Sequence, residues 1–216
     1  MQKKNYVSLA MLSLAILSNS SYAADCSSEP IDPAGDVSKL KDALQQATNT
    51  GKPLTITGTY NISTDLQVFL KRDLMVTATG AKFIATENLD GDMFSFDSNS
   101  SKSNECNSRD ELTDIHWNGG DFDISLAKVS KVVPIVDKTP AGREGTKNTG
   151  DALSIRGVIK DSSTSTYRLK VNEVIIENIT VNGTVNNTDN LFLAGGDSGI
   201  LMGGAAKAII RNNKFY

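Results

Sequence analysis

The chain has 216 residues, with 22 basic and 25 acidic side chains and a formal net charge of −3 at pH 7. This acidic balance argues against general nucleic-acid binding. One histidine and two widely separated cysteines exclude a zinc cluster, and neither a P-loop nor a dinucleotide-binding fingerprint is present.

The first 23 residues are typical of an export signal. Lys3 and Lys4 precede an apolar core over residues 7–17, and the small residues Ser21 and Ala23 follow at the distance that a signal peptidase requires. We therefore expect a secreted or periplasmic protein without a membrane span, because the apolar core is too short to cross a bilayer. An N-terminal segment, 24–35, would open the mature chain, leaving 20 basic and 25 acidic residues.

Both cysteines, Cys26 and Cys106, belong to the mature part of this exported chain. An oxidising compartment permits a disulfide between them, and two unpaired thiols are the alternative.

A helix is expected directly after residue 35. Asp36 can cap it, and Gly51 followed by Pro53 ends it. The apolar residues of this segment recur on one face, at Val37, Leu40, Leu44 and Ala47.

From residue 54 the apolar residues recur with a period of two, which indicates short strands. The clearest of these residues are Leu54, Ile56, Tyr60, Ile62, Leu74, Val76 and Ala78.

Three Gly-Asp pairs each precede a short apolar strand, at 91–92, 150–151 and 196–197, and they mark a repeat. Short strands that cannot bury their own apolar face stack on copies of themselves, so the pattern predicts a solenoid over 36–216. In the first two copies we expect the second and fourth residues after the Asp to point inward. The first, third and fifth residues are expected to face solvent, namely Met93, Ser95 and Asp97, and Ala152, Ser154 and Arg156. The inserts 97–111, 125–149, 156–170 and 184–195 would wall a binding groove.

Aligned asparagines follow the second strand of each repeat, at Asn118, Asn178 and Asn212. Asparagine tolerates left-handed backbone, and its amide can bond to the same residue one coil away. The sequence therefore predicts a tight turn in which Asn178 and Asn212 stack.

Five segments together resemble the pectate-lyase-like superfamily: DVSKLKDALQQA, KPLTITGTYNIS, LMVTATGAKFIA, VIIENITVNG and AIIRNNKFY. The resemblance implies an all-β fold, a right-handed parallel β-helix with an N-terminal amphipathic capping helix. Polygalacturonases of that superfamily also carry a paired Asp-Asp and a Gly-His-Gly, and this chain has neither. Because the chain closes on a strand, a turn and a strand, we expect the β-helix to be truncated at its C-terminal end.

Asp92, Asp151 and Asp197 begin corresponding strands beside the expected groove. Neighbouring carboxylates about 4.8 Å apart would recruit a cation, so calcium is the expected cofactor. The alternative is that each aspartate caps its own turn. A further coil hidden between Asp92 and Asp151 would break this column.

Arg156 faces outward after the second Gly-Asp strand and, with Asp151, is the candidate catalytic pair. Its guanidinium could hold a sugar carboxylate or act as a base. An ion pair with Asp97 one coil away is the alternative. Glu177 and Arg211 are expected to form another cross-coil pair.

A basic insert could attract an anionic glycan to the groove, with Lys138, Arg143 and Lys147 as candidate binding residues. A solvated loop is the alternative. Tyr167 offers a ring on which sugars can stack, whereas Trp117 is expected in the core.

These observations predict an exported polysaccharide-active protein, a lyase, hydrolase or epimerase acting on a uronate-rich glycan. A glycan-binding or surface β-helix that performs no chemistry is the alternative, because this architecture serves many functions.

Overall fold

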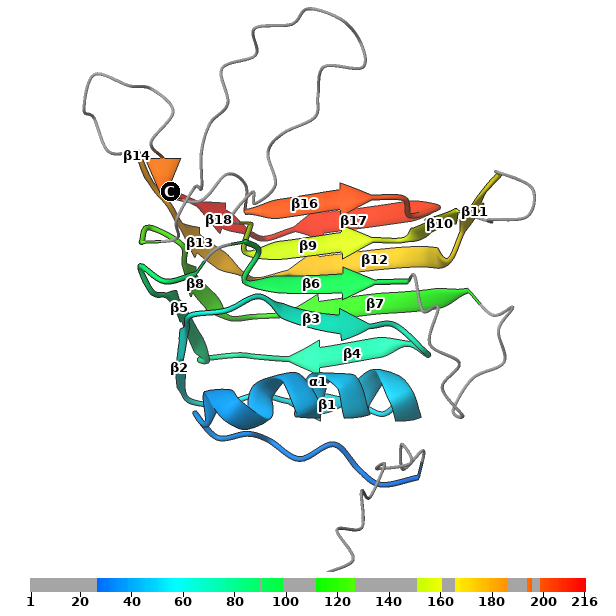
Figure 1. Ribbon diagram of the computed structural model, residues 1–216, viewed down its shortest axis with the longest axis horizontal. Helices are drawn as coiled ribbons and strands as arrows, with labels where there is room; N and C mark the ends of the chain where they lie inside the picture. The colour runs from blue at the N-terminus through cyan, green and yellow to red at the C-terminus, as the bar shows by residue number, and fades with distance from the viewer. Residues whose placement is uncertain are drawn as a thin grey trace, which may run out of the picture.

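The computed structural model describes residues 27–89, 91–98, 112–126, 151–160, 166–185, 194–195 and 199–216. In these ranges the protein is mostly β, with parallel sheets and one helix (Figure 1). The described part of the chain contains no helix with the length and apolar character needed to cross a membrane.

Three parallel sheets carry the fold. Sheet A contains β1 (Leu54–Thr55), β4 (Leu74–Thr77), β7 (Thr113–Asn118), β12 (Val171–Glu177) and β17 (Lys207–Arg211), in that order. Sheet B contains β2 (Thr59–Ile62), β5 (Lys82–Ala85), β8 (Asp121–Asp123), β13 (Thr180–Asn182) and β18 (Lys214–Phe215). Sheet C contains β3 (Leu66–Phe69), β6 (Phe94–Asp97), β9 (Leu153–Arg156) and β16 (Ile200–Gly203).

The chain visits sheets A, B and C in turn and then begins again, so that strands from successive passes lie side by side. This is the stacking that the repeat predicted. Two further antiparallel pairs lie in the inserts. They are β10 (Val158–Lys160) with β11 (Tyr167–Leu169), and β14 (Thr184–Val185) with β15 (Ala194–Gly195).

The core is built from equivalent residues of successive coils. In sheet A, Leu54 is in register with Val76, Val76 with Trp117 and Trp117 with Ile176, and all four are buried, which confirms the core position of Trp117. In the middle of the core the ring of Phe83 packs against Phe94 at 5.1 Å and against Phe122 at 4.9 Å between centroids. Because equivalent apolar residues of successive coils stack on one another, the coils together exclude water that a single flat, narrow coil could not exclude.

The expected helix is confirmed as α1 (Val37–Thr50), with Asp36 accepting from the Ser38 backbone N–H and Gly51 in the left-handed conformation at its end. Its apolar face joins the core through Leu40, Leu44 and Ala47, whereas Val37 is 38% exposed and does not. The helix lies at the β1 end of the stack (Figure 1).

Two polar side chains of α1 bond the backbone at the edge of the stack. The amide of Gln45 donates to the Phe69 carbonyl at 2.8 Å and accepts from the Phe69 N–H at 2.9 Å, as a neighbouring strand would. Thr48 Oγ1 donates to the Arg72 carbonyl at 2.9 Å and accepts from the Lys71 N–H at 2.9 Å. These hydrogen bonds satisfy backbone N–H and C=O groups on the open edge of β3 and in the turn after it.

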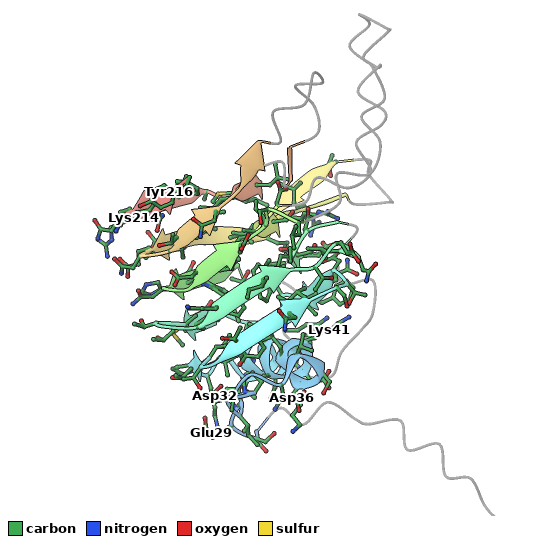
Figure 2. All side chains as sticks on the ribbon, turned by 90° about the vertical axis from the view of Figure 1, so that its left-hand side faces the viewer. Glu29, Asp32, Asp36, Lys41, Lys214 and Tyr216 are labelled. Atoms are coloured by element: carbon green, nitrogen blue, oxygen red, sulfur yellow. The ribbon has the colours of Figure 1, made fainter. Side chains whose placement is uncertain are left out.

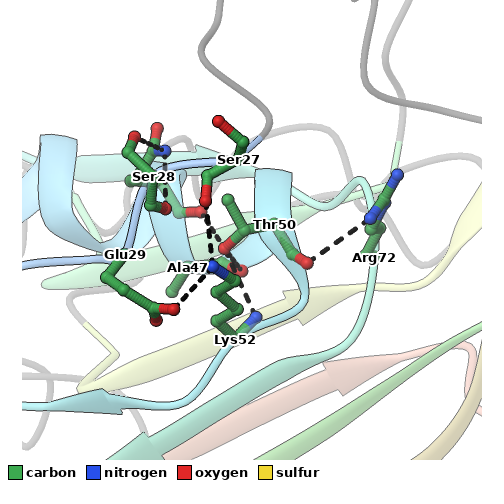
Figure 3. A network of polar contacts seen from close by, with 8 residues as sticks. Ser27, Ser28, Glu29, Ala47, Thr50, Lys52 and Arg72 are labelled. Carbon is green, nitrogen blue, oxygen red and sulfur yellow. Dashed lines mark hydrogen bonds and ion pairs between the residues drawn. The ribbon is translucent and has the colours of Figure 1, made fainter.

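The segment before α1 is tied to the end of the helix. Figure 3 shows Lys52 Nζ bonding Glu29 Oε1 at 2.6 Å and the Ser27 carbonyl at 2.9 Å. Beside them, Thr50 Oγ1 donates to the Ala47 carbonyl at 3.2 Å.

The asparagine turn is confirmed in its backbone. Asn178 and Asn212 have positive φ values of 59° and 57°. Asn178 Nδ2 donates to Asn118 Oδ1 at 2.8 Å. This hydrogen bond joins the asparagines of two neighbouring coils. Asn213 also holds the turn, because its side chain donates to the Ile176 carbonyl and accepts from the Ile179 N–H, each at 3.0 Å.

Candidate functional site

The first two Gly-Asp strands are direct neighbours in sheet C. Phe94 of β6 is in register with Leu153 of β9, so no further coil lies between them. Asp92 and Asp151 therefore belong to adjacent coils, and the Asp151 N–H points at Asp92 Oδ1 over 3.4 Å. In the third copy Ile200 is in register with Leu153, although it stands one place later after its aspartate.

The outward-pointing residues of sheet C are less exposed to solvent than the alternation of inward and outward positions along its strands predicts. Phe94, Phe96, Leu153 and Ile155 are buried as expected. The outward residues Met93, Ser95, Ala152 and Ser154 are also fully buried, which corrects the expectation that they face solvent. The polar groups on this face therefore interact at reduced hydration, which strengthens both hydrogen bonds and ion pairs.

Arg156 forms an ion pair with Asp92, with 3.2 Å between Nη2 and Oδ2. The residue in register with Arg156 is Asp97, at the far end of β6, so the arginine side chain runs back along the face of the sheet to reach Asp92. The Asp92 side chain is 4% exposed, whereas that of Arg156 is 53% exposed. Asp92 therefore holds one side of a guanidinium whose other donors remain accessible.

Asp65, which the sequence analysis missed, also belongs to this site. It directly precedes β3, and Ser95 Oγ donates to its Oδ1 at 2.8 Å while lying 3.4 Å from Asp92 Oδ2. The signal that could have found Asp65 is the alternation of Leu66 and Val68 directly after it, although these residues stand one place nearer to the aspartate than Phe94 and Phe96 do to Asp92.

Loss of hydration raises the pKa of Asp65, and the nearby charge of Asp92 raises it further. The hydrogen bond from Ser95 and the charges of Arg156 and Lys41 oppose these effects. Asp65 itself still contacts solvent. It is thus an accessible carboxyl that retains its proton to a higher pH than an ordinary aspartate.

Ser154 lies one coil from Ser95 and in register with it. Its hydroxyl is fully buried and has no hydrogen-bond partner among the described residues. A buried hydroxyl without a hydrogen-bond partner is uncommon. The described residues therefore do not satisfy every hydrogen-bonding group on this face of sheet C.

Asp151 is fully buried, so its side chain has no direct contact with solvent. Asp197, Lys138, Arg143 and Lys147 lie outside the described residues. Tyr167 begins β11, and only its backbone position is described. Cys26 and Cys106 also lie outside the described ranges, so their disulfide stays a prediction.

Within the described ranges, no group of three or more His, Cys, Asp or Glu side chains is placed to hold a metal ion. Asp92 already bonds Arg156, and Asp197 lies outside these ranges. Calcium binding by the three aspartates stays a prediction.

A second polar cluster lies on the outer face of sheet A. Glu177 accepts from Arg211 Nε at 2.6 Å through one oxygen, which confirms the expected pair, and its other oxygen lies 2.9 Å from His116 Nε2. Arg211 and, to a lesser extent, His116 hold the pKa of Glu177 below its ordinary value. Every oxygen of this carboxylate thus has a partner, as in a structural link between coils.

Comparison of the chain with known proteins finds no relative. No protein-family model, no curated protein and no solved structure matches the chain significantly. The proposed function therefore rests on the site alone.

Proposed function

We propose that this protein is an exported right-handed parallel β-helix of the pectate-lyase-like kind, with α1 as its N-terminal cap, that acts on a uronate-rich polysaccharide. The cross-coil bonds of Gln45 and Thr48 support the role of α1 as a cap. The observation that carries the activity is the cluster of Asp65, Ser95, Asp92 and Arg156 on the outer face of sheet C.

Each member of the cluster has a role that follows from its surroundings. Arg156 binds a sugar carboxylate through its accessible donors, since a guanidinium can form two parallel bonds to a carboxylate. Asp92 orients Arg156 by bonding one nitrogen. Asp65 exchanges a proton with the sugar, because a raised pKa brings a carboxyl closer to the operating pH of an acid or base. Ser95 orients Asp65.

The experiment is to incubate the protein with pectate and with alginate, each with and without Ca²⁺. New unsaturated ends are followed by absorbance, and new reducing ends by a chemical assay. We expect products from the wild type and a loss of roughly 100-fold or more in rate for Asp65→Asn, as is typical when an acid–base group is removed. Asp121→Asn, an exposed carboxylate on sheet B, is the matched control.

Arg156→Gln should weaken binding of the oligouronate, which titration calorimetry measures separately from turnover. If the wild type binds the glycan but yields no products, the protein is a glycan-binding β-helix without chemistry. If neither glycan binds, both forms of the proposal are wrong.

A further inference from the structure

Two serines lie side by side on the outer face of sheet C. Ser95 of β6 and Ser154 of β9 are in register, and both are fully buried although they occupy outward positions. Their hydrogen bonds differ. The Ser95 hydroxyl donates to Asp65 Oδ1 at 2.8 Å, whereas the Ser154 hydroxyl has no hydrogen-bond partner among the described residues. A buried hydroxyl without a partner costs free energy, and a hydroxyl group of a ligand can recover it.

The Arg156 side chain crosses the sheet beside these two serines. Its backbone stands two residues beyond Ser154 on the same face of β9, and its Nη2 atom ends 3.2 Å from Asp92 Oδ2. The same Oδ2 atom lies 3.4 Å from Ser95 Oγ. The side chain therefore extends from its own row back to the row of the serines, which is about 7 Å along the strands.

The guanidinium is not locked in this position. The Arg156 side chain is 53% exposed, so it can turn outward into solvent. Asp92 would keep two polar neighbours, because the Asp151 N–H lies 3.4 Å from its Oδ1 and Ser95 Oγ lies 3.4 Å from its Oδ2. Outward movement of the arginine thus costs less than the separation of a fully buried ion pair.

This part of the face is also favourable for an anion. Burial raises the pKa of Asp65, and the charges of Arg156 and Lys41 oppose that shift, so both cations are close enough to act on this carboxyl. Figure 2 shows Lys41 on α1, where its side chain is exposed. A carboxylate ligand that reaches Arg156 is therefore attracted by two positive charges.

We propose that Arg156 and Ser154 form a subsite for one uronic acid unit. The guanidinium turns outward to bind the sugar carboxylate and thereby uncovers the Ser154 hydroxyl, which bonds a hydroxyl group of the same sugar. This subsite rests on the proposed function and makes it more specific. A site built to bond both groups rejects a neutral sugar, which lacks the carboxylate, and a plain carboxylic acid, which lacks the hydroxyl.

The first experiment measures whether Arg156 covers Ser154. Ser154→Cys is reacted with iodoacetamide in the wild-type chain and in Arg156→Gln, and modification at position 154 is followed by mass spectrometry of peptides. We expect the reaction to be about tenfold faster or more in Arg156→Gln, because a thiol reacts only when reagent reaches it. Ala152→Cys, at a buried outward position of the same coil, should react slowly in both and so reports general loosening. Equal rates at position 154 in both backgrounds, or equal acceleration at position 152, would overturn the proposal.

The second experiment measures binding by titration calorimetry. The probes are the uronic acid monomers obtained from pectate and from alginate, together with cyclohexanecarboxylate. Ser154→Ala should bind the preferred uronic acid about fivefold more weakly, because one hydrogen bond is lost, and should leave cyclohexanecarboxylate unchanged. Arg156→Gln should weaken both, whereas Ser63→Ala, an exposed serine, should weaken neither.

Unfolding in urea shows whether the variants remain folded. Ser154→Ala should not destabilise the free protein, since its hydroxyl bonds no described residue, whereas Ser95→Ala should. Unchanged uronic acid affinity in Ser154→Ala, or no binding of either monomer by the wild type, would overturn the subsite, and cleavage of pectate or alginate by the same protein would leave the proposed function standing. Binding that depends on Ser154 without binding or cleavage of either polymer would support the subsite and remove the proposed function.

Discussion

Arg156, at the end of β9, forms an ion pair with Asp92, at the start of the previous Gly-Asp strand, although its register neighbour is Asp97 at the end of that strand. The arginine thereby crosses the outer face of sheet C and ties two coils together over a buried carboxylate. A buried charge that loses its partner is costly, because water cannot replace the missing bond.

Replacing Arg156 with Gln should therefore destabilise the protein by about 1–3 kcal/mol, less than a fully buried pair would lose, because the guanidinium is half exposed. Urea unfolding of the wild type and Arg156→Gln measures this. Adding Asp92→Asn should recover part of the loss, since the buried charge that has lost its ion pair with Arg156 is then removed. Strictly additive effects of the two substitutions would contradict a direct link.

Two glycines with positive φ separate backbone strain from steric overlap. A Cβ at Gly58 would lie 2.7 Å from the Gly35 backbone nitrogen, whereas a Cβ at Gly80 would meet nothing within 4 Å. Gly80→Ala should cost about 1–2 kcal/mol for the left-handed conformation alone. Gly58→Ala should cost at least about 1 kcal/mol more, because backbone must move. Equal midpoints in thermal or urea unfolding would show that the Gly35 turn yields without cost.

Asn178→Ala should destabilise the protein by about 1–2 kcal/mol, chiefly because alanine resists a φ of 59°. The Asn178 to Asn118 bond is exposed to solvent, so its loss adds little. Asn178→Gly is the informative control, since glycine accepts this backbone. A glycine variant as unstable as the alanine variant would assign the cost to the side-chain bond instead.

Acid should weaken the link between Glu177 and Arg211. The pKa of Glu177 is lowered in the folded protein, so its contribution is present above the ordinary value of 4.5 and is lost as pH falls through the folded value. The destabilisation caused by Arg211→Gln should therefore be larger at neutral pH than in strong acid. Urea midpoints across this range test it, with Lys214→Gln on β18 as control. A pH-independent difference would mean that Arg211 acts by packing.

Much of the architecture follows from local sequence. The helix α1 begins after Asp36 and ends before Gly51, because a capping side chain and a left-handed glycine act within one helical turn. The alternation at Leu54, Ile56 and Tyr60 indicates strands because successive side chains point to opposite faces. The asparagine turns follow from the backbone that asparagine tolerates.

The site depended on pairing that no local pattern determines. Asp92 and Asp151 are 59 residues apart, and the entropy of closing a loop rises so slowly with its length that spacing alone could not show their strands to be neighbours. The same holds for Asp65, which joins the site through Ser95, and for Arg156, whose long side chain reaches Asp92 although its register neighbour is Asp97. Sequence alone determined the repeating strands and the turns between them, because backbone preference and hydrophobic alternation act over a few residues. Tertiary structure decided which charges meet, because burial and register arise only when the coils stack.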